Sequence, residues 1–124
     1  MSRKKAGGKL QSMVPLLLVG APGAETDRKA SLLESKGFLV TRADTICHAE
    51  IFAAEQYFDA AIYDESITPQ EQVSLARIMR VRWPWMRLVS MGHLPANFDP
   101  DLFDTWSASE ETLPNTLNQI LISS

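Results

Sequence analysis

Cysteine is nearly absent from this chain, since Cys47 is the only one among its 124 residues. A single cysteine cannot form an intramolecular disulfide, and it excludes a CxxC metal or redox site. Long hydrophobic runs are missing too. The longest, Met13 to Val19, is far shorter than the ~20 residues that a membrane-spanning helix needs. These absences predict a globular protein without a membrane span, for which we expect a reducing, cytoplasmic setting.

Positive charge is scarce in the body of the chain. Of the 12 Lys and Arg residues, four lie within the first ten positions, and none follows Arg87. The remaining body is acidic, and an acidic body binds nucleic acid poorly because phosphate contacts need Lys and Arg. We therefore expect residues 1–12 to be a flexible basic tail, residues 13–124 to be one domain, and nucleic acid to be no partner.

Short apolar runs alternate with helical periodicity along the domain. Strands are predicted at 14–19, 38–42, 60–63, 87–91 and 104–108. Helices are predicted at 25–36, from Thr45 onward, at 69–82 and around 113–121. Such alternation predicts a three-layer α/β fold whose five-stranded parallel sheet is doubly wound, with the flavodoxin-like order 2-1-3-4-5. A fourth helix would be shortened, because Pro95 and Pro100 interrupt residues 93–103.

The carboxyl ends of the strands are where such folds bind their ligands. Four segments form that edge in the predicted fold: 20–23, 64–69, 91–93 and 107–109. The first, Gly20-Ala21-Pro22-Gly23, follows a strand and precedes a helix, so it is either a phosphate-binding turn or a simple tight turn. Asp64 likewise has two interpretations, as a reactive carboxylate or as a cap of the loop that follows.

Asp64 ends the third predicted strand in the segment Ala-Ala-Ile-Tyr-Asp-Glu-Ser. This segment, and the ungapped spacing from Val19 through Gly37-Phe38 and Asp59 to Asp64, resembles the response-regulator receiver domain of two-component phosphorelay signalling. The resemblance covers residues 14–121 and puts Asp64 at the phosphoacceptor position. It implies transfer of a phosphoryl group from a histidine kinase to this carboxylate, with Mg²⁺ neutralising the charge that develops.

Three of the four groups that support this reaction in the family have no counterpart at the matching positions. The two acids that hold Mg²⁺ correspond to Gly20 and Ala21, and the lysine that pairs with the acyl phosphate corresponds to Ser109. The hydroxyl residue that senses the phosphoryl group corresponds to Ser90 or to Gly92, depending on the alignment. These losses predict a degenerate receiver domain, a pseudoreceiver.

The function we expect is therefore phosphorylation-independent protein–protein interaction in signal transduction, with no enzymatic activity, metal or other cofactor. The expected partner is another signalling protein, such as a histidine kinase, a regulator or an output domain. One alternative is a working phosphoacceptor on Asp64 with weak Mg²⁺ affinity. A second is a small-ligand sensor that uses the pocket vacated between Gly20 and His93. Without neighbouring acids, Asp64 should be ionised.

Two regions are candidate interfaces. Trp83 and Trp85 lie between the third helix and the fourth strand, and aromatic residues are favoured at interface centres, although such a loop can also fold onto the core. The resemblance implies a second interface along the fifth strand and last helix, with Trp106 at the switch position, Leu113 and Leu117 at its border, and a homodimer as one outcome. Four arginines near the tryptophans form a basic patch that suits an acidic partner: Arg77, Arg80, Arg82 and Arg87.

Overall fold

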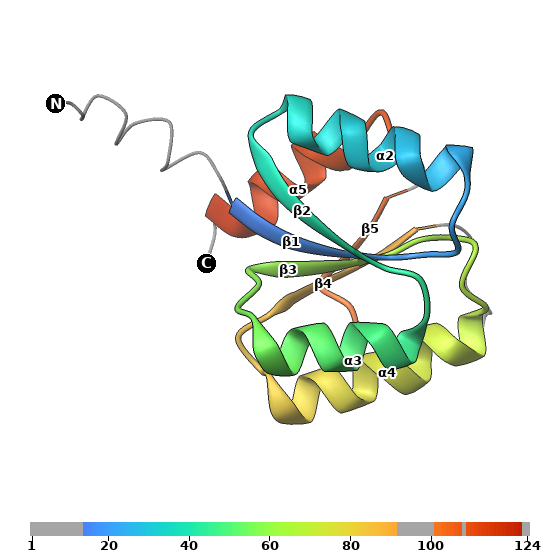
Figure 1. Ribbon diagram of the computed structural model, residues 1–124. Coiled ribbons are helices and arrows are strands. Elements are labelled where there is room, and N and C mark those ends of the chain that lie inside the picture. Colours follow the sequence, from blue (N-terminus) through green and yellow to red (C-terminus); the bar gives the residue numbers. More distant parts are fainter. Residues whose placement is uncertain (1–13, 92–100, 108, 123–124) are drawn as a thin grey trace, which may run out of the picture.

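The computed structural model describes residues 14–91, 101–107 and 109–122. In these residues five strands alternate with four helices, as Figure 1 shows. The elements are β1 (Val14–Val19), α2 (Ala24–Ser35), β2 (Phe38–Ala43), α3 (Ile46–Glu55), β3 (Ala60–Tyr63), α4 (Pro69–Arg82), β4 (Arg87–Met91), β5 (Thr105–Ser107) and α5 (Leu113–Ile122). The predicted tail, residues 1–12, lies outside the described residues.

The strands form one parallel sheet in the order β2-β1-β3-β4-β5, which confirms the predicted topology. Helices α2 and α5 cover one face of the sheet, and α3 and α4 cover the other (Figure 1). The chain moves outward from β1 to β2 and then returns to β3 on the other side of β1. The strand order therefore reverses between β1 and β3, and Asp64 follows directly at that point.

The sheet is buried on both faces, which explains why its strands are continuous apolar runs. Leu17 and Val19 of β1 face the core beneath α3 and α4, while Leu16 and Leu18 face the core beneath α2 and α5. All four side chains are almost completely inaccessible to water. In the described residues no helix is long and apolar enough to cross a membrane.

Local sequence signals fix several of the element ends. Thr45 accepts a hydrogen bond from His48 N and so caps α3. Thr68 and Glu71 form a capping box at the start of α4, directly before Pro69, whose missing N–H is not needed there. Gly37 has φ 95°, a conformation that side chains disfavour, and turns the chain from α2 into β2.

The connection between β4 and β5 is described only from residue 101 onward, and that described part contains no helix. Leu102 and Phe103 instead insert into the core on the α3–α4 side, where the Phe103 ring meets Tyr63 edge to face at 5.3 Å. Arg80 Nε donates to Leu102 O over 2.9 Å and holds this segment in place. Most of the region predicted to hold a shortened helix lies outside the described residues.

The predicted interface at Leu113 and Leu117 is wrong. Both side chains are fully buried in the core formed with α2 and the sheet. The cause is the amphipathic pattern of α5, whose apolar stripe at i and i+4 covers the sheet and is not free to contact a partner.

Candidate functional site

Asp64 lies at the carboxyl end of β3 and is only 2% exposed. Its backbone N donates to Val19 O over 2.8 Å, which holds it beside the end of β1. Its Oδ2 accepts a hydrogen bond from Ser66 N over 3.0 Å. The carboxylate thus caps the loop after β3, which was one of the two interpretations that the sequence left open.

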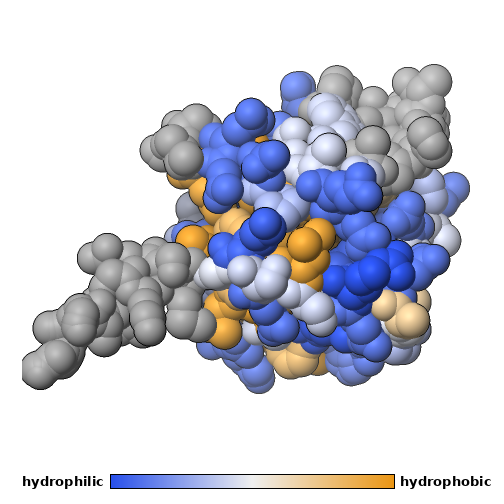
Figure 2. All heavy atoms as spheres, turned by 90° about the horizontal axis from the view of Figure 1, so that it is seen from above, coloured by the Kyte–Doolittle hydropathy of each residue, from blue (hydrophilic) through white to orange (hydrophobic). Residues whose placement is uncertain are grey.

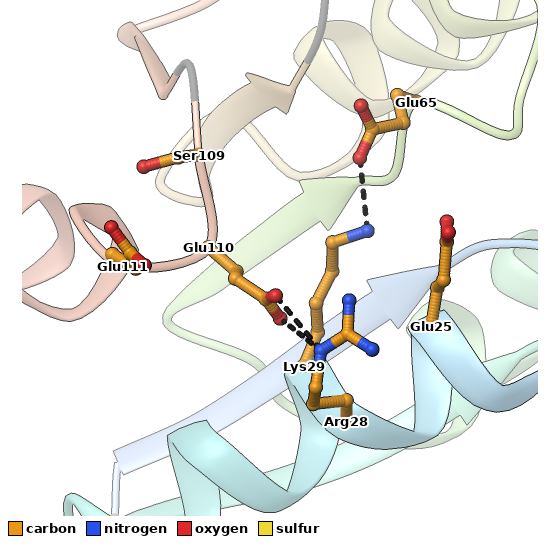
Figure 3. Close-up of a pocket in the computed structure, with 7 residues that line it drawn as sticks. All are labelled: Glu25, Arg28, Lys29, Glu65, Ser109, Glu110 and Glu111. Atoms are coloured by element: carbon orange, nitrogen blue, oxygen red, sulfur yellow. Dashed lines mark hydrogen bonds and ion pairs between the residues drawn. The ribbon is translucent and has the colours of Figure 1, made fainter.

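The second carboxylate oxygen of Asp64 is bound by a lysine from a distant part of the chain. Lys29 Nζ, on α2, lies 2.5 Å from Asp64 Oδ1 and 3.0 Å from Glu65 Oε1. The Lys29 side chain is 4% exposed and that of Asp64 3%, so the ion pair between them is buried. Figure 3 shows Lys29 extending from α2 to Glu65 at the end of β3. Asp64 therefore already has a resident cation.

The electrostatics of this pair keep both groups charged. Burial alone raises the pKa of Asp64, but the hydrogen bonds from Lys29 and Ser66 outweigh it and the pKa is lowered overall. Burial alone likewise lowers the pKa of Lys29, but its hydrogen bonds to Asp64 and Glu65 leave it raised. The ionised state predicted for Asp64 agrees with these directions. Its cause is the set of hydrogen bonds from Lys29 and Ser66 and not an absence of acids, because Glu65 shares the Lys29 ammonium.

The space beside Asp64 at Gly20 is filled. A Cβ atom added to Gly20 would lie 2.7 Å from Asp64 Cβ and 3.3 Å from its Oδ2. An acidic side chain cannot enter there without displacing Asp64, so the close approach of the Asp64 side chain favours glycine at this position. The predicted vacated pocket is therefore not open at Gly20, and His93, its other boundary, lies outside the described residues.

The turn after β1 is engaged by the protein itself. Ala21 is exposed, and its N–H donates to Ser66 Oγ over 2.9 Å. Thr26 Oγ1 donates back to Ala21 O over 2.7 Å. This supports the interpretation of residues 20–23 as a tight turn that joins β1, α2 and the loop after β3.

A cavity of about 360 Å³ lies next to the Lys29 ion pair, between α2 and the segment before α5 (Figure 3). Arg28 Nε closes one side by donating to both carboxylate oxygens of Glu110, over 2.9 and 3.2 Å. The lining is mostly charged and dominated by glutamates: Glu25, Arg28, Lys29, Glu65, Ser109, Glu110 and Glu111.

The comparison with solved structures identifies the fold. A CheY-like receiver domain from Methanospirillum hungatei superposes with a TM-score of 0.80 at 18% identity, covering 90% of this chain and 95% of that one. The response regulator TrrA of Thermotoga maritima, solved with Mg²⁺–BeF, gives 0.76 at 14%, covering 87% and 99%. CheY4 of Vibrio cholerae gives 0.74 at 17%, covering 87% and 98%. This chain has the receiver fold.

Sequence comparison alone does not reach this result. No protein-family model matches the chain, and neither does any curated protein. At these identities the likeness to solved receivers establishes the fold, which confirms the α/β architecture expected from the sequence.

The residues present do not fit the Mg²⁺ that the receiver fold implies. Gly20 and Ala21 offer no side-chain ligand, and the Lys29 ammonium takes up Asp64 and Glu65. Within the described ranges no three His, Cys, Asp or Glu side chains are grouped so that they could hold a metal ion. A divalent cation would have to displace a buried positive charge before it could reach Asp64.

Ser90, one candidate for the receiver's sensing hydroxyl, is fully buried at the end of β4. Its Oγ donates to Gln72 Oε1 over 2.6 Å, and Gln72 Nε2 donates to Ile67 O over 3.0 Å. These bonds tie β4 to α4 and to the loop after β3. The other candidate, Gly92, lies outside the described residues.

The remaining predicted positions are spread along the structure. Ser109 lines the glutamate-rich cavity, and Ser109 O accepts from Thr112 Oγ1 over 3.1 Å just before α5. Trp106 lies on the edge strand β5 and is exposed. Trp83 is partly buried against the core, whereas Trp85 is exposed. The structure thus brings Asp64, Gly20 and Ala21 together and leaves the tryptophans elsewhere.

Lys29 is the residue of the candidate site that the sequence analysis missed. It lies on the inward stripe of α2, between Thr26 and Leu33, all of them buried. A lysine on the core-facing stripe of an amphipathic helix is the signal that could have found it, because a buried lysine is rarely left without a carboxylate partner.

Proposed function

We propose that this receiver-fold chain is a signalling module that binds a protein partner without being phosphorylated, with its ancestral phosphoacceptor site held in one state by Lys29. The observation that carries this proposal is the buried ion pair between Lys29 Nζ and Asp64 Oδ1, with Glu65 as a second acceptor. The partner would be another signalling protein of the cytoplasm, such as a histidine kinase, a regulator or an output domain.

The chemistry of phosphoryl transfer supports this proposal. The acceptor carboxylate must present an oxygen to phosphorus, and cations must neutralise charge on the transferring oxygens. Here one oxygen of Asp64 accepts from Lys29 and the other from Ser66. Removing one partner of a buried ion pair typically costs about 3–5 kcal/mol. Freeing Asp64 for attack would therefore be expensive, and the described residues offer no group of ligands that could hold a divalent cation to offset that energy.

One observation favours a competing hypothesis, in which Asp64 still accepts a phosphoryl group. Lys29 places an ammonium where a phosphorylated Asp64 would need positive charge, and could replace the lysine that is lost at Ser109. The lack of space at Gly20 and the burial of Asp64 weigh against it. The two hypotheses differ in a single measurable response, which is binding of an acyl-phosphate mimic at Asp64.

Amide NMR titration with millimolar Mg²⁺ and then with beryllofluoride tests the proposal. For the wild-type chain we expect no saturable shift at the amides of Gly20, Asp64 and Ser109. The matched control is Lys29→Met, which keeps an unbranched side chain, one atom shorter, and removes its charge. Saturable shifts at Asp64 in the wild type, or a mass increase of one phosphoryl group after incubation with acetyl phosphate, would establish the competing hypothesis.

A further inference from the structure

Two aromatic side chains are held side by side at the amino-end edge of the sheet, opposite the Asp64 site. Tyr57 precedes β3 and Trp85 precedes β4. Their rings are stacked, with centroids 6.4 Å apart and planes 8° from parallel. Tyr57 is 58% exposed and Trp85 53%. Tyr57 Oη donates to Asp59 Oδ1 over 2.7 Å, which fixes its ring. The pair is therefore a preformed, largely apolar surface that is exposed to solvent.

Positive charge and further apolar surface lie at the end of α4, close to Trp85 in the sequence. The Arg82 guanidinium lies 4.6 Å from the centre of the Trp83 ring, and Val81 is the most exposed large hydrophobic side chain of the described residues. Arg82 is itself half exposed and makes only a long contact, 3.5 Å, with Glu50. We call Tyr57, Val81, Arg82, Trp83 and Trp85 the arginine–aromatic surface.

The charge on this side of the molecule differs from that of the rest. Helix α4 carries Arg77, Arg80 and Arg82 against the single acid Glu71. Arg80 is engaged by Asp104, whereas Arg77 and Arg82 are exposed at the surface. The nearby acids Asp59 and Glu50 are engaged by Tyr57 Oη and by Arg82. The face that carries α2 and α5 is largely hydrophilic, with only small hydrophobic areas (Figure 2). Rigid exposed aromatic rings beside arginine are the composition of interface centres.

We propose that the arginine–aromatic surface is the docking site for an acidic segment of another protein. An apolar or aromatic anchor of that segment seats on the Tyr57–Trp85 pair, and its carboxylates face Arg82 and Arg77. Charge complementarity sets the choice of occupant. The basic N-terminal segment of this chain, with Arg3, Lys4, Lys5 and Lys9, is repelled by the arginines. Nucleic acid is disfavoured by the acidic body.

This inference rests on the proposed function only in taking the chain to act by binding. The surface and the Asp64 site lie at opposite ends of the strands, so each can be tested separately. A positive beryllofluoride response would refute the proposed function and leave the docking surface untouched. Conversely, failure of docking would leave in place the proposal that Asp64 is not phosphorylated.

The test selects binders from a library of random peptides displayed on phage, with counter-selection on a Trp85→Ala variant. We expect enriched peptides to carry net negative charge around an aromatic, leucine or proline anchor. A synthetic copy of an enriched peptide should shift the Trp85 indole N–H signal. Its affinity should fall more than about tenfold in Tyr57→Ala and Trp85→Ala, and about threefold in Arg82→Gln. Trp85→Phe should restore part of the loss.

Controls separate this occupant from the others. Ala21→Asp should bind the selected peptide as the wild type does, since Ala21 is exposed at the far edge of the sheet. Several outcomes would overturn the proposal: no enrichment, enrichment of neutral or basic peptides, or equal binding to Trp85→Ala. A doubling of mass in sedimentation that Trp85→Ala abolishes would assign the surface to a second copy of the chain. Binding of an oligo-dT strand that Trp85→Ala abolishes would assign it to nucleic acid.

Discussion

The side chains at the two edges of the sheet differ in their exposure to water. At the carboxyl edge, Asp64, Lys29 and Ser66 satisfy one another, and the ion pair is closed to water. At the amino edge, Tyr57 and Trp85 stack on each other, and about half of the surface of each residue stays exposed. A site of chemistry needs unsatisfied polar groups, and a site of recognition needs accessible apolar ones. The difference supports the proposal that the amino edge, and not the carboxyl edge, serves the binding of a partner.

The largest effect is expected from breaking the carboxyl edge with Lys29→Met. The change leaves Asp64 ionised, buried and without its main partner, which should destabilise the fold by about 3–5 kcal/mol. Chemical denaturation monitored by circular dichroism measures the free energy of unfolding. The double variant Lys29→Met/Asp64→Asn removes both charges and should recover much of the loss. Equal destabilisation of the single and double variants would mean that the ion pair is not what Lys29 contributes.

A second test of the same edge adds the acid that receivers carry. Gly20→Asp places a Cβ 2.7 Å from Asp64 Cβ, so overpacking should cost about 1–3 kcal/mol. The neighbouring change Ala21→Asp, at an exposed position, is the matched control and should alter stability by less than about 0.5 kcal/mol. Thermal unfolding of both variants, with and without Mg²⁺, distinguishes them. Stabilisation of Gly20→Asp by Mg²⁺ would contradict the filled site.

The pH dependence of stability sharpens the comparison, because the carboxyl edge titrates. The folded-state pKa of Asp64 is lowered, so its contribution is present above the unfolded value of about 3.9 and is lost as pH falls through the folded pKa. The folded-state pKa of Lys29 is raised, so its contribution is present below about 10.4 and is lost as pH rises through the folded pKa.

Unfolding free energies measured from acid to alkaline pH should therefore fall at both ends. The difference between the wild type and Lys29→Met should be largest between these limits and should shrink below pH ~4 and above pH ~10.4. A difference that stays constant across the whole range would assign the effect of Lys29 to packing of its side chain. Trp85→Ala, which removes no charge, should give a curve parallel to that of the wild type.

The sequence predicts the elements well because their signals are local. The Pro69–Arg82 helix needs only its capping box, its proline and its apolar stripe, and all of them lie within the helix and its cap. The buried strands are predicted as easily, since a short apolar run such as Ala60–Tyr63 is typical of a strand covered on both faces. The strand order then follows from the connections.

The site is harder to predict because its decisive contact is not local. Lys29 and Asp64 are 35 residues apart, and a family comparison looks for a cation only at the positions where the family has one. The comparison therefore records the loss at Ser109 and misses the lysine that arrives from α2. Leu113 and Leu117 show the opposite error, in which an interface taken from the family outweighed a periodicity that already indicated the core.

Trp85→Ala should have only a small effect on stability, and it distinguishes a role of Trp85 in binding from a role in the fold. Half of the indole is already in water, so its loss should change the unfolding free energy by less than about 1 kcal/mol. Leu117→Ala removes a fully buried side chain and should cost about 2–5 kcal/mol. If Trp85→Ala destabilises the chain as much as Leu117→Ala does, Trp85 serves the fold. If it leaves stability unchanged and abolishes the binding of an acidic peptide, the exposed ring of Trp85 serves binding.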